Sequence, residues 1–178
     1  MSRLIKKFFA FLCALFGLCY LGLIIYAYLP YDEVPVAELA TPLDHFIEID
    51  GKKIRYRVYS DGYSIKPNLI LVHGFGNSLN TWRLIVPELQ KYYRVIGMDL
   101  IGFGLSSKSD NYDYSNQNQA RTISLFAAAL HLDSFIIGGH SLGGAIAVHV
   151  ALNNEKTTGM ILFNPGIITT GVPEITRY

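Results

Sequence analysis

The sequence predicts an α/β protein in which a mainly parallel sheet is covered by helices on both faces and is preceded by one membrane-spanning helix. Three observations support this prediction. From about residue 65 onward, short apolar runs alternate with longer segments whose apolar residues recur at helical spacing. The short runs are continuous, which is typical of strands buried on both faces of a parallel sheet. Near the N-terminus, the stretch 8–29 is uncharged and apolar on every side.

The stretch 8–29 is long enough to cross a bilayer as a helix. It lacks the short apolar core and the small-residue cleavage site of a signal peptide, so we expect an uncleaved anchor, with a signal peptide as the alternative. Three cations precede it and three acids follow it: Arg3, Lys6 and Lys7, then Asp32, Glu33 and Glu38. Because positive flanks stay in the cytoplasm, this asymmetry predicts a single-pass membrane protein whose N-terminus is cytoplasmic.

These features divide the chain into four parts: a cytoplasmic N-terminus (1–7), the transmembrane anchor (8–29), an extended linker (30–44) and a globular domain (45–178) on the periplasmic or extracytoplasmic side. The domain begins with a predicted β-hairpin, in which Asp50 and Gly51 separate the arms 46–49 and 53–59. Strands and helices then alternate. The expected strands cover 69–72, 94–98, 135–138 and 160–163, and the expected helices cover 81–91, 117–130 and 142–153.

Ser141 lies in a Gly-x-Ser-x-Gly pattern, which is typical of nucleophilic serines. The strand 135–138 runs into Gly139, His140, Ser141, Leu142 and Gly143, and the helix 142–153 leaves directly from this turn. A serine on a sharp strand-to-helix turn presents its hydroxyl above the sheet, and the first N–H groups of the helix are free to bind an oxyanion. By itself the pattern is equally compatible with a glycine-rich strand-to-helix turn that has no catalytic role.

Two other loops strengthen the prediction. The strand 69–72 runs into His73, Gly74, Phe75 and Gly76, and the strand 94–98 runs into the loop 99–106. With these three loops in this order, the chain resembles the α/β-hydrolase superfamily over roughly 45–170. Within it, Gly-His-Ser-Leu-Gly-Gly is most similar to lipases, esterases and acylglycerol hydrolases, including membrane-anchored monoacylglycerol lipases. The serine argues against epoxide hydrolases and haloalkane dehalogenases, which carry aspartate there.

The resemblance implies a role for each motif residue. Ser141 would be the nucleophile, and the backbone N–H groups of Phe75 and Leu142 would form the oxyanion hole. The supporting residues would be His73, Gly74, Gly139, His140 and Gly143. For His73 we expect a structural role in holding the oxyanion loop and not a catalytic one.

A serine hydroxyl also needs a histidine base and an orienting acid, which in this superfamily follow the nucleophile in the chain. No histidine follows His149, and the acids beyond Ser141 are Glu155 and Glu174. We therefore expect 45–178 to be the N-terminal part of a hydrolase domain, C-terminally truncated and inactive alone. In such a fragment the strand 160–163 would be an apolar sheet edge that favours aggregation.

The sequence thus predicts a serine hydrolase of carboxylic esters, with a lipid-derived or other small-molecule ester as substrate. Three alternatives stay open: another reaction of the same fold (C–C hydrolysis or a perhydrolase), a non-enzymatic truncated product, or an anchored binding module. We expect no cofactor and no metal, because no cysteine–histidine cluster is present and both cysteines lie in the anchor. A net charge of +1 without a basic patch argues against nucleic acid.

Overall fold

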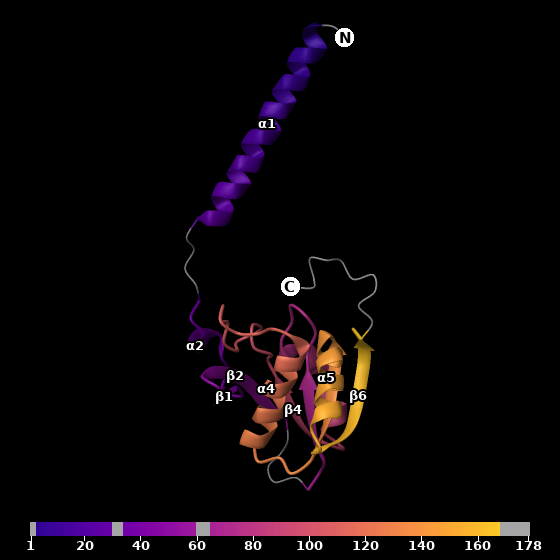
Figure 1. Ribbon diagram of the computed structural model, residues 1–178. Coiled ribbons are helices and arrows are strands. Elements are labelled where there is room, and N and C mark those ends of the chain that lie inside the picture. Colours follow the sequence, from indigo (N-terminus) through magenta and orange to yellow (C-terminus); the bar gives the residue numbers. More distant parts are fainter. Residues whose placement is uncertain (1–2, 30–33, 60–64, 168–178) are drawn as a thin grey trace. The chain divides into compact units, whose positions relative to one another are not determined.

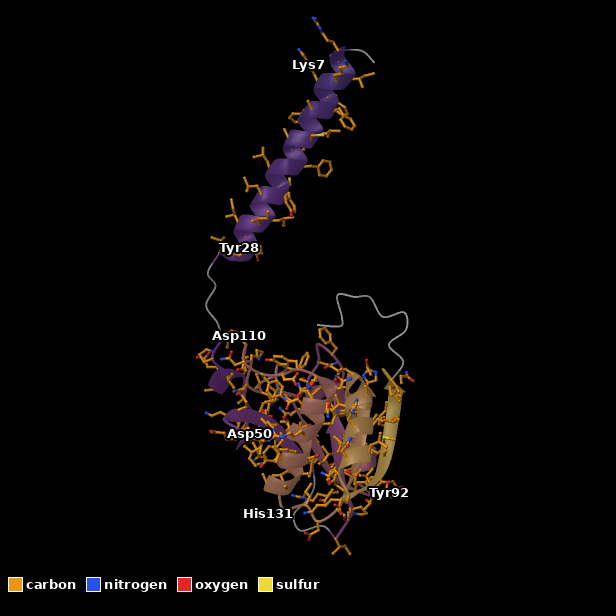
Figure 2. All side chains as sticks on the ribbon, in the orientation of Figure 1. Lys7, Tyr28, Asp50, Tyr92, Asp110 and His131 are labelled. Atoms are coloured by element: carbon orange, nitrogen blue, oxygen red, sulfur yellow. The ribbon has the colours of Figure 1, made fainter. Side chains whose placement is uncertain are left out.

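The computed structural model describes residues 3–29, 34–59 and 65–167. The chain forms two compact units, Met1–Glu38 and Leu39–Tyr178. The first unit contains the helix α1 (Arg3–Tyr28), none of whose residues is buried. Figure 2 shows apolar side chains on all sides of this helix between Lys7 and Tyr28. By length and composition α1 can cross a membrane, as the sequence predicted, and a signal sequence near an N-terminus shares these features.

The second unit is built on a six-stranded sheet of order β1-β2-β4-β3-β5-β6 (Figure 1). The strands β3, β4, β5 and β6 run parallel to one another, whereas β1 and β2 are antiparallel to their neighbours, which confirms a mainly parallel sheet. The strand bounds are β1 (His45–Ile49), β2 (Lys52–Tyr59), β3 (Asn68–Val72), β4 (Arg94–Met98), β5 (Phe135–Ser141) and β6 (Thr157–Pro165).

The predicted hairpin is present, with Ile49 opposite Lys52 across the turn. Asp50 and Gly51 have φ values of 48° and 72°, the left-handed pair that a two-residue hairpin loop of this twist requires. Its outer strand β1 forms one end of the sheet, and β6 forms the other.

Helical segments cover both faces of the sheet, as predicted. Alternate residues of a strand point to opposite faces, and those of β3 separate two clusters of buried side chains. Ile70 and Val72 pack with α4 (Asn116–Ala129) and α5 (Leu142–Asn153). Leu69 and Leu71 pack with the 3₁₀-helix η1 (Leu79–Leu84) and the short helix α3 (Val86–Leu89).

Two local predictions were wrong. The single helix expected over 81–91 is divided into η1 and α3, which meet at Ile85. Pro87 has no N–H to bond the carbonyl one turn earlier, so a continuous helix cannot form there, whereas a helix can start there. The linker expected to be extended over 30–44 contains the helix α2 (Val36–Leu39), although 30–33 lie outside the described residues.

The strands β5 and β6 are longer than expected at the end nearest the serine turn. Ser141 pairs with Pro165 in their register, after an irregularity between His140 and Ser141. The loop that carries Asp110 lies beyond the carboxyl ends of the parallel strands (Figure 2). Tyr92 and His131, which precede β4 and β5, lie beyond the opposite, amino ends of these strands.

Candidate active site

Ser141 occupies the turn between β5 and α5 with φ 51° and ψ −118°. A non-glycine residue in this region of backbone space is uncommon and strained, and such strain persists only where the surroundings impose it. Here the surroundings are the end of β5, of which Ser141 is the last residue, and the end of the neighbouring strand β6. The Ser141 carbonyl accepts a hydrogen bond from the N–H of Gly166, just beyond β6, at 2.8 Å. The serine is partly exposed, so its hydroxyl can meet a reactant from outside.

The glycines on either side of Ser141 allow the turn to close. A β-carbon on Gly139 would overlap the backbone carbonyl of Gly143, and one on Gly143 would overlap the carbonyls of Val72 and His73. The first turn of α5 therefore lies in direct backbone contact with the end of β3. This contact brings the start of α5, with its unsatisfied N–H groups, beside the loop that follows β3.

The loop after β3 passes over Ser141. Gly74 is buried, and a β-carbon there would lie 3.2 Å from Ser141 Cβ and 3.1 Å from His140 Nδ1. The next residue, Phe75, is 67% exposed, and its ring makes an edge contact with Phe103 at a centroid distance of 5.5 Å. The backbone of the Gly74–Phe75 segment and the start of α5 at Leu142 thus approach Ser141 from two sides.

His73 is fully buried beneath this loop, and both of its ring nitrogens have partners. Nδ1 lies 2.7 Å from the Gly74 carbonyl and therefore carries the proton, while Nε2 accepts the Leu100 N–H at 3.1 Å. Burial lowers the pKa of His73, which outweighs the opposing effects of the Gly74 carbonyl and of the Asp99 charge. A neutral imidazole with both nitrogens engaged links the ends of β3 and β4 and has no free lone pair for Ser141.

The other histidines are likewise not placed to act as a base for Ser141. In residues 3–29, 34–59 and 65–167 no hydrogen bond joins the Ser141 hydroxyl to a histidine. His140 Nδ1 is buried and lacks a partner within the described residues. His149 lines a polar surface groove of about 450 Å³ between α4 and α5, to which Ser141 does not contribute. His45 and His131 are exposed.

The loop after β4 is organised by Asp99, whose side chain is fully buried. Its Oδ1 accepts the N–H of Leu79 at 2.6 Å, and its Oδ2 accepts the N–H of Leu105 at 2.8 Å. A β-carbon on Gly104, where φ is 52°, would overlap this carboxylate. Asp99 therefore fixes both its own loop and the start of η1, immediately after the loop 73–78.

A buried charge network lies next to Asp99, and sequence reasoning missed it. Arg55 on β2 donates to Asp44 from Nε at 2.6 Å and to Asp99 from Nη1 at 3.1 Å, and Arg57 donates to Asp44 from Nε at 2.6 Å. Burial by itself raises the pKa of Asp44, but the hydrogen bonds from Arg57, Arg55 and Thr41 outweigh it and hold that pKa well below its usual range. The signal in the sequence was two arginines two residues apart in a strand, hence on one face.

Within the described part of the chain, no group of three or more histidine, cysteine, aspartate or glutamate side chains could hold a metal ion.

The comparisons agree with this geometry. A family model for the alpha/beta hydrolase fold matches residues 67–174, and the chain belongs to this family. It is 31% identical to 2-hydroxy-6-oxo-6-(2'-aminophenyl)hexa-2,4-dienoic acid hydrolase of Metapseudomonas resinovorans, over 76% of this chain and 47% of that protein. It is 36% identical to a 1-acylglycerol-3-phosphate O-acyltransferase of Mus musculus, over 65% of this chain and 34% of that protein.

Solved structures give the same assignment. A bacterial membrane phospholipase A matches with a TM-score of 0.65 and 27% identity, covering 93% of this chain and 52% of that one. A meta-cleavage product hydrolase from Pseudomonas fluorescens matches with a TM-score of 0.62 and 32% identity, covering 68% of this chain and 44% of that one. The chain covers between 34% and 52% of the length of these four proteins. Relatives of this chain are thus named as hydrolases and as an acyltransferase.

Proposed function

We propose that this chain carries the nucleophile and the oxyanion hole of a serine hydrolase that cleaves lipid-derived carboxylic esters. The observation that carries the proposal is the strained backbone of Ser141, at the junction of β5 and α5, with Gly74 packed against it. A strained serine beneath a second backbone segment is the arrangement that acyl transfer requires, because the nucleophile and the oxyanion donors must face one point in space.

In this mechanism Ser141 Oγ attacks the ester carbonyl and forms a bond to its carbon. The carbonyl oxygen becomes an oxyanion and accepts hydrogen bonds from the N–H groups of Phe75 and Leu142. The C–O bond to the alcohol then breaks, the alcohol leaves with the proton that the base took from Ser141 Oγ, and water hydrolyses the acyl-enzyme that remains. His73, Gly74, Gly139, His140 and Gly143 support the geometry of the turn and the loop.

The hydroxyl proton must pass to a base, and none of the described histidines is placed to take it. We propose that the histidine and its acid belong to segments of the complete protein beyond this chain, in the order that the family follows. The matched proteins support this division, because the aligned part of this chain covers only 47% and 50% of their lengths. The chain by itself would then retain the site but little of the activity.

The choice of lipid esters rests on two observations. The names of two similar proteins, the membrane phospholipase A and the acylglycerolphosphate acyltransferase, concern acyl groups on glycerolipids. The helix α1, a candidate membrane span in the same chain, would also anchor the protein to a bilayer, where lipid esters are found. Cations precede this helix, so we propose that the domain lies on the extracytoplasmic side.

A second reaction is favoured by one specific finding. The dienoic acid hydrolase and the meta-cleavage product hydrolase are at least as similar in sequence as the phospholipase is. The complete protein would then hydrolyse a 2-hydroxy-6-oxo-dienoic acid at a C–C bond. Release of fatty acid from a phospholipid, compared with the loss of absorbance of such a dienoic acid, separates the two reactions directly.

A fluorophosphonate probe tests the site itself, because it modifies only an activated serine. We expect the complete protein to be labelled, Ser141→Ala to abolish the labelling, and Ser134→Ala, a change at an exposed serine before β5, to leave it unchanged. Absence of labelling in the correctly folded complete protein would overturn the proposal and favour an anchored binding module. Labelling that persists in Ser141→Ala would place the nucleophile elsewhere.

Topology is tested separately with a reporter enzyme that is active only outside the cytoplasm. Fused after Tyr178, the reporter should be active. Replacing Arg3, Lys6 and Lys7 with glutamate should lower that activity severalfold, because the charge asymmetry that orients the helix is removed. Equal activity of the two fusions would refute the proposed basis of the orientation.

A further inference from the structure

We propose that Asp44 is a positioning residue for the loop 73–80, which it holds at both ends through Arg55 and Arg57. The inference rests on the proposed function, in which this loop supplies the Phe75 N–H to the oxyanion hole. Asp44 lies outside every motif discussed above, between α2 and β1.

The Asp44 carboxylate is fully enclosed and fully paired. Its side chain is 0% exposed, and Oδ1 accepts the Nε–H groups of both Arg55 and Arg57 at 2.6 Å. Its Oδ2 accepts Arg57 Nη2 at 3.1 Å and the Thr41 N–H at 2.7 Å. Charge-assisted bonds of this kind fix the orientation of the two guanidinium planes, because each plane donates from a rigid fork.

Arg55 connects Asp44 to the start of the loop 73–80 through a chain of hydrogen bonds. Its Nη1 donates to Asp99 Oδ2 at 3.1 Å, and the residue after Asp99, Leu100, donates its N–H to His73 Nε2 at 3.1 Å. His73 in turn bonds the carbonyl of Gly74. The first two residues of the loop are therefore linked to Asp44 through buried groups only.

Arg57 and Asp99 hold the far end of the same loop. Arg57 Nη1 donates to Asn80 Oδ1 at 3.2 Å, and Asp99 Oδ1 accepts the N–H of Leu79 at 2.6 Å. Phe75 lies between these two attachment points. A displacement of either arginine therefore changes the path of the segment that carries the Phe75 N–H.

Removal of the Asp44 charge would leave Arg57 without a carboxylate partner and Arg55 with Asp99 alone, in a site where both side chains are largely buried. An unpaired buried cation is unfavourable, so the guanidinium groups are expected to turn toward water and to release Asp99 and Asn80. The predicted consequence is local loosening of 73–80, with the β5–α5 junction left intact, since none of the network residues contacts that junction by a hydrogen bond.

Hydrogen–deuterium exchange on the full 178-residue chain in detergent micelles tests the proposal. In Asp44→Asn, amides of 73–80 should exchange about tenfold faster than in the unchanged protein, while amides of 135–153 exchange at the same rate. The matched control is Asp50→Asn, which makes the same change at an exposed ion pair with Arg121 and should affect neither segment. Asp44→Glu, which retains the carboxylate, should bring the exchange of 73–80 back toward that of the unchanged protein.

Two results would overturn the inference: unchanged exchange at 73–80, or equal acceleration in 73–80 and 135–153, which is the signature of a purely global effect. If Asp44→Asn does not fold, Arg57→Gln removes the link from Asp44 to Asn80 while Arg55 keeps both of its carboxylates. Unaltered exchange of 73–80 in that variant also overturns the inference. Exchange requires no reaction at Ser141, so local loosening in this chain, combined with absence of fluorophosphonate labelling in the correctly folded complete protein, would refute the proposed function and leave the role of Asp44 standing.

Discussion

Gly74 and Ser141 pack closely across two strand ends, so a methyl group on Gly74 would fit only if its neighbours shifted by a few tenths of an ångström. A β-carbon there would lie 3.2 Å from Ser141 Cβ, closer than most real contacts of this kind. The segment before Phe75 and the turn at Ser141 are therefore placed by one another, and the spacing between the proposed nucleophile and the proposed oxyanion donor depends on this contact.

The first prediction concerns that spacing. In the complete protein, Gly74→Ala should lower the rate of Ser141 labelling by fluorophosphonate about tenfold, because the loop must move by a few tenths of an ångström and weaken the Phe75 donor. The unfolding midpoint should change much less than the labelling rate. An unchanged rate in the folded variant would show that the loop does not set the oxyanion geometry.

Gly143 is predicted to be indispensable for folding. A β-carbon there would overlap the carbonyls of Val72 and His73, which are backbone atoms and cannot turn aside. We expect Gly143→Ala to destabilise the protein by more than about 3 kcal/mol in urea unfolding. The matched control is Gly159→Ala in β6, where the new methyl group would be 3.5 Å from Ile136 Cγ1, an ordinary contact, and stability should change by less than about 1 kcal/mol. Similar losses in the two variants would contradict the packing described here.

The stability of the domain should depend on the protonation of His73. Burial lowers the pKa of His73 from its ordinary value of 6.5, so the folded state takes up its proton at a lower pH than the unfolded state does. The contribution of neutral His73 is therefore complete above about pH 6.5 and is lost as the pH falls through that value toward the folded pKa.

Urea unfolding at about pH 7.5 and about pH 5 measures this effect. The free energy of unfolding should fall more between these values in the unchanged protein than in His73→Asn, which has no imidazole to protonate. His131→Asn, at an exposed histidine, should keep the full pH dependence. A constant difference between the unchanged protein and His73→Asn at both pH values would refute the assignment.

The edge strand β6 should control self-association of the unit Leu39–Tyr178. None of its residues is fully buried, and Met160 is 43% exposed at the end of the described sheet. Such an apolar edge can pair with the same strand of another molecule. We expect this polypeptide to form concentration-dependent oligomers in light scattering, and Met160→Lys to reduce them severalfold.

Leu152→Lys is the control for that experiment. Leu152 is 77% exposed but belongs to the helix α5 and has no place in the strand pairing of the sheet, so its replacement should have little effect on association. A monomeric preparation of the unit Leu39–Tyr178, or equal effects of the two lysine variants, would show that β6 is not the site of association.

Much of the fold was determined by local sequence. The left-handed pair Asp50–Gly51 defines the hairpin, the apolar run before Ser141 defines β5, and the uncharged stretch before Tyr28 defines α1. Each of these depends on the order of neighbouring residues, so periodicity and turn chemistry predict it without knowledge of the fold. The division between η1 and α3 at Pro87 was equally local, and the sequence analysis overlooked it.

The tertiary structure alone decided which charged and polar side chains pair with one another. Arg55 meets Asp99, and His73 meets Leu100, because the order β1-β2-β4-β3 places strands from distant parts of the chain side by side. A sequence shows that Arg55 and Arg57 share a face of a strand, but not that this face covers a buried aspartate. Ion pairs and buried hydrogen bonds depend on which strands become neighbours, and that choice is made by the burial of the whole sheet.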